Sequence, residues 1–166
     1  MRHADRPTVT ESIEVPAPPE RVWPLVSDIA LPVGVSAELQ SVRWADDDID
    51  SRPRAGRRFV GRNANRYFGE WETVATVVEC DEPRTFAWDV GDLGEPNTRW
   101  RFTLEPVDGG TRVTQWGQLG FGPSGLHHAI AAMPDKEERI VERRCEEFRV
   151  GMRANLEAIR RAVGDG

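Results

Sequence analysis

The sequence predicts an α+β domain in which a seven-stranded antiparallel sheet wraps around one long C-terminal helix. Between residues 8 and 119, short stretches alternate apolar and polar side chains, as strands with one buried and one wet face do. From about residue 135 the apolar spacing changes to that of a helix. At 166 residues the chain suits a single domain, which we assign to residues 8–163.

The N-terminal part is expected to hold one strand and two short helices. Residues 1–7 are polar and predict a flexible arm. Thr8–Val15 alternates as a strand, although Glu11 falls among the apolar residues of its inner face. A proline-rich segment ends this strand, and Pro19 suits the first turn of a short helix. Residues 28–36 predict a second short helical segment.

Six more strands should follow in quick succession. Alternating apolar positions and turn-forming residues place them near residues 39–45, 57–62, 67–80, 86–90, 100–104 and 111–119. The sequence Asp108-Gly109-Gly110 predicts a tight hairpin before the last strand. Polar residues occupy every second position of these strands, so one face of the sheet should be in contact with water. This pattern is typical of antiparallel sheets.

The last third of the chain predicts one helix from about Asp135 to Ala162, with Pro134 in its first turn. This helix would be roughly 40 Å long. Its apolar side chains recur every three or four residues and form one narrow stripe, which consists of Val141, Cys145, Phe148, Met152, Leu156, Ile159 and Val163. The helix cannot bury this stripe alone, so the sheet must wrap around it. A sheet that grips a helix in this way encloses space for a ligand.

The composition argues against several classes of protein. A net charge of −6 does not suit a nucleic-acid binder, because phosphate contacts need a basic surface. Apolar runs are too short to span a membrane, and the N-terminus lacks the apolar core of a secretory signal. Cys80 and Cys145 suit neither a disulfide framework nor a zinc site, so we expect a cytoplasmic protein with no metal and no cofactor.

Four stretches carry a resemblance to a known family, namely residues 15–28, 70–88, 109–115 and 152–156. In these stretches the chain resembles START-like (SRPBCC) proteins of the polyketide cyclase/dehydrase type, which have the helix-grip fold. The resemblance covers about residues 8–163. It implies a hydrophobic cavity for a lipid, sterol, polyketide or other apolar molecule. Some relatives close or dehydrate polyketide rings, whereas many only bind a ligand, and no universal catalytic motif can be transferred.

Inward-facing aromatic and polar residues are the candidate ligand-binding residues. Trp88 and Trp100 are best placed to form pocket walls, because both lie in clearly alternating strands. An apolar pocket also uses a few polar groups to orient its ligand. The candidate set is Trp88, Trp100, Gln115, Asn63, Phe148, Met152 and Asn155. Each polar member could instead bond to backbone or water, and the catalytic residues are unknown.

Two other groups of polar residues resemble a calcium loop and a catalytic histidine pair, but we interpret both as surface residues. The D-x-D-x-D segment at residues 46–50 opens like a calcium loop, yet Ser51 and Arg57 stand where glycine and glutamate are needed. We therefore interpret it as a solvated acidic loop. His127 and His128 have no nucleophile in a recognisable motif beside them, so we expect surface histidines, one of which could rim the cavity entrance.

Binding of a small hydrophobic molecule in an internal cavity is the function that these observations favour. The alternative is a cyclase or dehydratase that acts on a bound poly-keto intermediate. We favour binding because no paired acid–base motif is visible. A protein-interaction or regulatory module is a weaker third alternative. The expected partner is the small ligand, without nucleic acid or membrane insertion, and a homodimer stays open.

Overall fold

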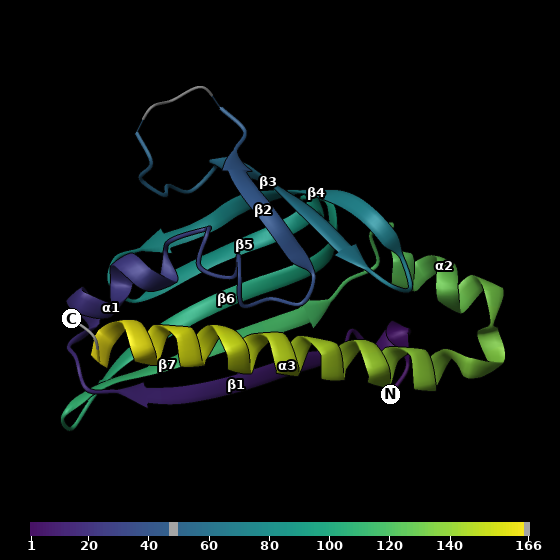
Figure 1. Ribbon diagram of the computed structural model, residues 1–166. Helices are drawn as coiled ribbons and strands as arrows, with labels where there is room; N and C mark the ends of the chain where they lie inside the picture. Colours follow the sequence, from purple (N-terminus) through teal and green to yellow (C-terminus); the bar gives the residue numbers. More distant parts are fainter. Residues whose placement is uncertain (47–49, 165–166) are drawn as a thin grey trace.

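The computed structural model describes residues 1–46 and 50–164 and confirms the predicted architecture. One antiparallel sheet has the strand order β1-β7-β6-β5-β4-β3-β2 and curls around the long helix α3 (Figure 1). The strands are β1 (Thr8–Val15), β2 (Leu39–Trp44), β3 (Arg58–Asn65), β4 (Gly69–Asp81), β5 (Thr85–Asp92), β6 (Glu95–Val107) and β7 (Gly110–Leu119). The helices are η1 (His3–Asp5), α1 (Pro19–Val26), α2 (Gly125–Ala132), η2 (Pro134–Lys136) and α3 (Glu137–Gly164).

The first connection differs from the sequence prediction in one detail. Residues 28–36 form successive hydrogen-bonded turns, and α1 is the only helix between β1 and β2. Pro32 has no backbone N–H to donate, and Gly34 adopts a φ of 92°. Both residues interrupt a helical hydrogen-bond ladder, so the segment covers the sheet as a loop.

The hairpin between β3 and β4 begins later than the sequence indicated. The Asn65 side-chain oxygen accepts hydrogen bonds from the backbone N–H groups of Tyr67 (2.9 Å) and Phe68 (2.7 Å). Gly69 then takes a φ of 70°, which favours glycine. These features turn the chain at residues 66–68, so β4 starts at Gly69 and not at Tyr67.

The short helix α2 was not predicted. Ser124 precedes it, and the serine side chain accepts a hydrogen bond from the backbone N–H of His127 at 3.4 Å. This contact is an ordinary N-cap. Helices α1 and α2 lie near opposite ends of α3, so each covers one end of the curled sheet (Figure 1).

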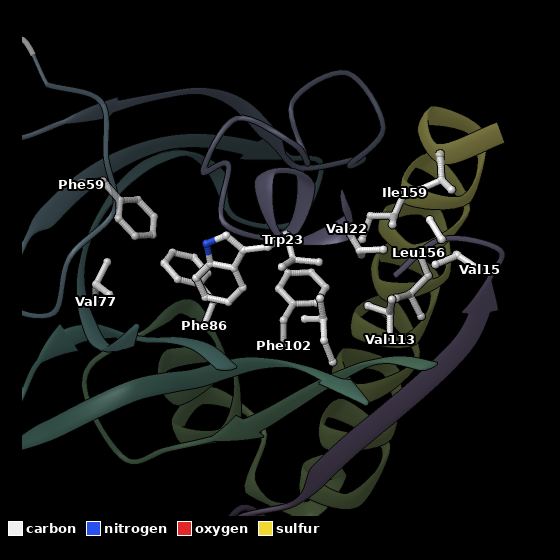
Figure 2. Packing of buried hydrophobic residues seen from close by; sticks show 14 of the residues in the cluster. Val15, Val22, Trp23, Phe59, Val77, Phe86, Phe102, Val113, Leu156 and Ile159 are labelled. Carbon is white, nitrogen blue, oxygen red and sulfur yellow. The ribbon is translucent and has the colours of Figure 1, made fainter. Parts of the chain in front are cut away.

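The buried apolar side chains form two clusters, one toward each end of α3. The first joins α1 and the C-terminal half of α3 to the sheet, and Figure 2 shows Trp23, Phe86 and Ile159 within it. The second joins α2 and the N-terminal half of α3 to β1 and β7. Met152 belongs to the second cluster and Leu156 to the first, so the boundary between them crosses the middle of α3.

The N-terminal arm, expected to be flexible, makes specific contacts with the domain. His3 is 9% exposed, and its Nε2 lies 2.6 Å from the carbonyl oxygen of Gly120. The imidazole also meets the Phe121 ring edge-on, with ring centroids 5.4 Å apart. Arg2 donates to the Glu137 carboxylate at 2.9 Å. These contacts link the arm to the segment just after β7 and to the start of α3.

Replacement of His3 tests whether this arm is docked in solution. His3→Ala should lower the free energy of unfolding by about 1–3 kcal/mol, because the Gly120 carbonyl loses its partner. Chemical denaturation followed by tryptophan fluorescence measures the change. His128→Ala, which removes an exposed histidine from α2, is the matched control and should have little effect. Equal stabilities of both variants and the original protein would contradict the docking.

Candidate functional site

A cavity of about 1010 Å³ lies between α3 and the inner face of the sheet. Its lining comes from strands β2 to β7, from the turns at residues 28–38, from α2 and from the middle of α3. The helix packs mainly along β1 and also contacts β7, α1 and α2. The inner faces of the strands beyond β7 therefore lie opposite α3 across a space, and apolar side chains predominate on the walls.

Aromatic rings form one continuous wall of this cavity. Trp88 on β5 stacks beside Trp100 on β6, with ring centroids 6.4 Å apart and an interplanar angle of 22°. Trp100 in turn meets Phe148 of α3 at 4.7 Å, which joins sheet to helix. Gly117 makes room for this contact, because a Cβ atom there would lie 2.8 Å from the Trp100 ring. The wall therefore depends on glycine at this position of β7.

All seven candidate residues lie in the lining of this one cavity. Trp88, Trp100 and Phe148 belong to the aromatic wall, and Met152 packs beside them in the second apolar cluster. Asn63 lies on β3, where its amide nitrogen is 3.4 Å from the Thr73 hydroxyl. The structure thus brings together residues from β3, β5, β6, β7 and α3 that are far apart in the sequence.

Gln115 and Asn155 form a buried amide pair between β7 and α3. The Asn155 Nδ2 donates to the Gln115 Oε1 at 3.3 Å, and the two residues are 8% and 3% exposed, respectively. Among the described residues, Asn155 Oδ1 is the only fully buried side-chain oxygen or nitrogen without a hydrogen-bond partner. An unpaired buried acceptor is costly, so this atom is an unusual feature of the cavity.

Charged residues gather at the rim, in an arrangement that sequence reasoning did not find. Arg144 of α3 donates to Glu38 at 2.5 Å and to Glu147 at 2.6 Å, and Glu38 also accepts from the Asn65 amide at 3.0 Å. Burial alone would lower the pKa of Arg144, but these two carboxylates raise it above its ordinary value. The network ties α3 to the start of β2 and the end of β3.

The other titratable groups are not placed to act as acids, bases or nucleophiles deep in the cavity. Every titratable side chain that lines the cavity is exposed or only partly buried. Burial raises the pKa of the Cys145 thiol, which keeps it protonated and unreactive, as expected of a small apolar core residue. His127 and His128 are both exposed on α2, and His128 belongs to the cavity lining.

Two acidic features of the sequence find arginine partners. Glu11, on the inner face of β1, forms an ion pair with Arg153 of α3 at 2.9 Å, which explains an acidic residue at that position. In the acidic loop, Asp46 accepts from Arg57 at 3.0 Å. Asp50 pairs with an arginine four residues later, also at 3.0 Å, and Asp48 lies outside the described residues.

Comparison with known proteins identifies the family. A family model described as polyketide cyclase / dehydrase and lipid transport matches residues 6–163. The chain belongs to this family. A search of curated proteins found no match.

Solved structures of similar fold agree with the membership in this polyketide cyclase / dehydrase and lipid transport family. The Polyketide_cyc-like protein Cgl2372 from Corynebacterium glutamicum is 30% identical, with a TM-score of 0.65 and coverage of 95% of this chain and 91% of that one. Ara h 8.0201 is 15% identical, with a TM-score of 0.60 over 96% and 99% of the two chains. The di-domain ARO/CYC BexL of the BE-7585A biosynthetic pathway is 14% identical, with a TM-score of 0.61 over 92% and 48%.

Residues 1–46 and 50–164 contain neither a membrane-spanning helix nor a metal-binding cluster. No helix in this part of the chain has both the length and the apolar character needed to cross a membrane. The same residues contain no group of three or more side chains suited to hold a metal ion.

The rim network can be tested by removal of its cation. Arg144→Met should lower the free energy of unfolding by about 1–3 kcal/mol, because two partly buried carboxylates then lose a charged hydrogen-bond donor. Arg143→Met is the matched control, since Arg143 is exposed and only lies over the Tyr67 ring. Urea denaturation compares the two variants. Loss of stability in Arg143→Met but not in Arg144→Met would contradict the assigned network.

Proposed function

We propose that this protein binds a small hydrophobic molecule in the cavity between α3 and the sheet. The observation that carries the proposal is the cavity itself, at about 1010 Å³ within a domain of 166 residues. Protein interiors are normally close-packed, and ligand pockets have volumes of about 300–1,000 Å³. A space of this size with predominantly apolar walls suits a ligand better than it suits water.

Exposed apolar side chains support a mouth beside the middle of α3. Val150 of α3 is 54% exposed and Val35 of the covering turns is 39% exposed, and both belong to the cavity lining. Tyr67, in the hairpin after β3, is also exposed and also lines the cavity. Apolar groups left in water around an opening are typical of sites that receive apolar ligands.

The distribution of titratable groups favours binding over turnover. General acid–base catalysis needs a titratable group within hydrogen-bond reach of the reacting atom. In the described lining such groups lie at the exposed or half-buried rim, where Arg144, Glu38 and Glu147 already bond to one another. The buried polar groups of the interior are amides, which orient a ligand but do not exchange protons near neutral pH.

A cyclase or dehydratase is the second candidate, and the family description favours it. The family includes polyketide cyclases and dehydrases, and BexL is a di-domain ARO/CYC of similar fold. In this reading the cavity would hold a poly-keto chain, and the amide pair would orient one of its carbonyl groups. Formation of a cyclised product from such a chain would establish this candidate.

We also propose a cytoplasmic location. The two cysteines of the chain are free thiols, and Cys145 is buried in the core. Such thiols persist in a reducing compartment.

Narrowing the cavity tests the proposed function directly. Val90→Phe adds a ring on the inner face of β5 and should weaken binding of an apolar probe such as naphthalene at least about tenfold. Val78→Phe adds the same ring at an exposed site on β4 and is the matched control. Isothermal titration calorimetry measures both affinities. Equal affinity in the two variants, or no binding by the original protein, would contradict binding in this cavity.

A further inference from the structure

We propose that the Gln115–Asn155 pair is a recognition site for a neutral hydroxyl group on the ligand. The preferred ligand is then an uncharged aromatic molecule that carries a phenol or alcohol group. This inference rests on the proposed function and makes the ligand class specific. Its starting point is the unpaired, fully buried Asn155 Oδ1.

A count of donors and acceptors shows which hydrogen bonds the Gln115–Asn155 pair lacks. Each side-chain amide offers one carbonyl acceptor and two N–H donors. The hydrogen bond between the two residues uses one N–H of Asn155 and the carbonyl of Gln115. The Asn155 carbonyl then needs a donor. The Gln115 amino group makes no hydrogen bond to the described residues, because the bond from Asn155 is the only one of the Gln115 side chain. Turning both amides over exchanges their roles and leaves the same surplus of one acceptor and one amino group.

A hydroxyl group can satisfy both the carbonyl and the amino group, because it is a hydrogen-bond donor and an acceptor. Its oxygen can accept from the Gln115 amino group, and its O–H can donate to the fully buried Asn155 carbonyl once that side chain turns toward the ligand. A ketone lacks the donor, and a plain hydrocarbon supplies neither interaction. The surplus therefore selects for a hydroxyl over both of these groups.

The position of the pair places the hydroxyl next to the aromatic wall. Asn155 is one turn beyond Met152 along α3, and both line the cavity. Gln115 lies two residues from Gly117, whose lack of a side chain admits the Trp100 ring. Gln115 also pairs with Phe102 across the β6–β7 ladder. A ligand ring on the Trp100 wall can thus direct a hydroxyl toward the amides.

The charges around the cavity argue that the ligand is neutral. Arg144 lines the cavity and pairs with Glu38 and Glu147, and Arg153 nearby on α3 pairs with Glu11. The other arginines of the lining, Arg66 and Arg143, lie over the exposed Tyr67 ring and away from the amide pair. A carboxylate placed at the amide pair would therefore lack a free cation, and burial of an unpaired charge is costly. The same argument disfavours an ammonium group, because Glu11 is already engaged.

Three ligands with one ring system separate these alternatives: naphthalene, 2-naphthol and 2-naphthoate. Calorimetry with the original protein should give affinity for 2-naphthol about tenfold or more above that for the other two ligands. If the cavity offered the hydroxyl no hydrogen-bond partner, 2-naphthol would instead bind more weakly than naphthalene, because the hydroxyl would lose its bonds to water without replacement.

Variants locate the effect at the amide pair. Asn155→Leu and Gln115→Leu should still bind naphthalene but should lose the preference for 2-naphthol. Gln118→Leu is the matched control on β7, because Gln118 is on the outer face, where it bonds to the Arg6 backbone. It should keep the preference. Asn155→Leu should also change the unfolding temperature little without ligand, because it removes the unpaired Asn155 carbonyl but leaves the Gln115 carbonyl without its donor.

The outcomes distinguish this inference from the function on which it rests. If the original protein binds all three ligands alike, or if Asn155→Leu keeps the preference, the hydroxyl site is wrong while cavity binding stands. A large loss of stability in ligand-free Asn155→Leu would assign the pair a structural role and overturn the inference. If none of the three ligands binds, both the inference and the proposed function fail.

Discussion

One helix cannot cover the inner face of seven curled strands, and this mismatch shapes the whole molecule. Helix α3 packs along β1 and reaches β7, so the inner faces of the remaining strands need other cover. Helix α1 supplies it at one end and α2 at the other, each with its own apolar cluster (Figure 1). The middle is left open as a cavity of about 1010 Å³, which close packing would otherwise remove.

The polar groups around that cavity divide into two zones with different roles. At the rim, Arg144 pairs with both Glu38 and Glu147 and joins the helix to the sheet edge. In the interior, the buried polar contact between helix and sheet is the uncharged Gln115–Asn155 pair. A low-dielectric interior penalises charge far more than it penalises an amide that can find a partner. The walls therefore favour neutral molecules, and the amide pair adds a preference for a particular group.

The sequence predicted the fold and placed seven candidate residues on inward faces, because both follow from local periodicity. Alternation placed Trp88 and Trp100 on the inner face, and the helical stripe placed Phe148 and Met152 opposite them. Contacts between distant residues left no such local signal. Arg144 and Glu38 are 106 positions apart, so only the folded chain shows that they meet. The turn at Asn65 did have a signal, since an asparagine side chain commonly bonds to the backbone two residues later and turns the chain, but the alternating pattern extended the predicted strand back to Tyr67.

The central claim is that the enclosed space exists to hold a small molecule. Native mass spectrometry of the freshly purified protein tests it most directly, because weakly activated ions keep ligands bound in cavities. The account predicts a one-to-one adduct with a small neutral molecule, either retained from the cell or formed on incubation with 2-naphthol. It also predicts that Val90→Phe, whose added ring narrows the space beside Trp88, retains less of this adduct than Val78→Phe does. Only the bare protein mass under both conditions, with no adduct at any activation energy, would contradict the account.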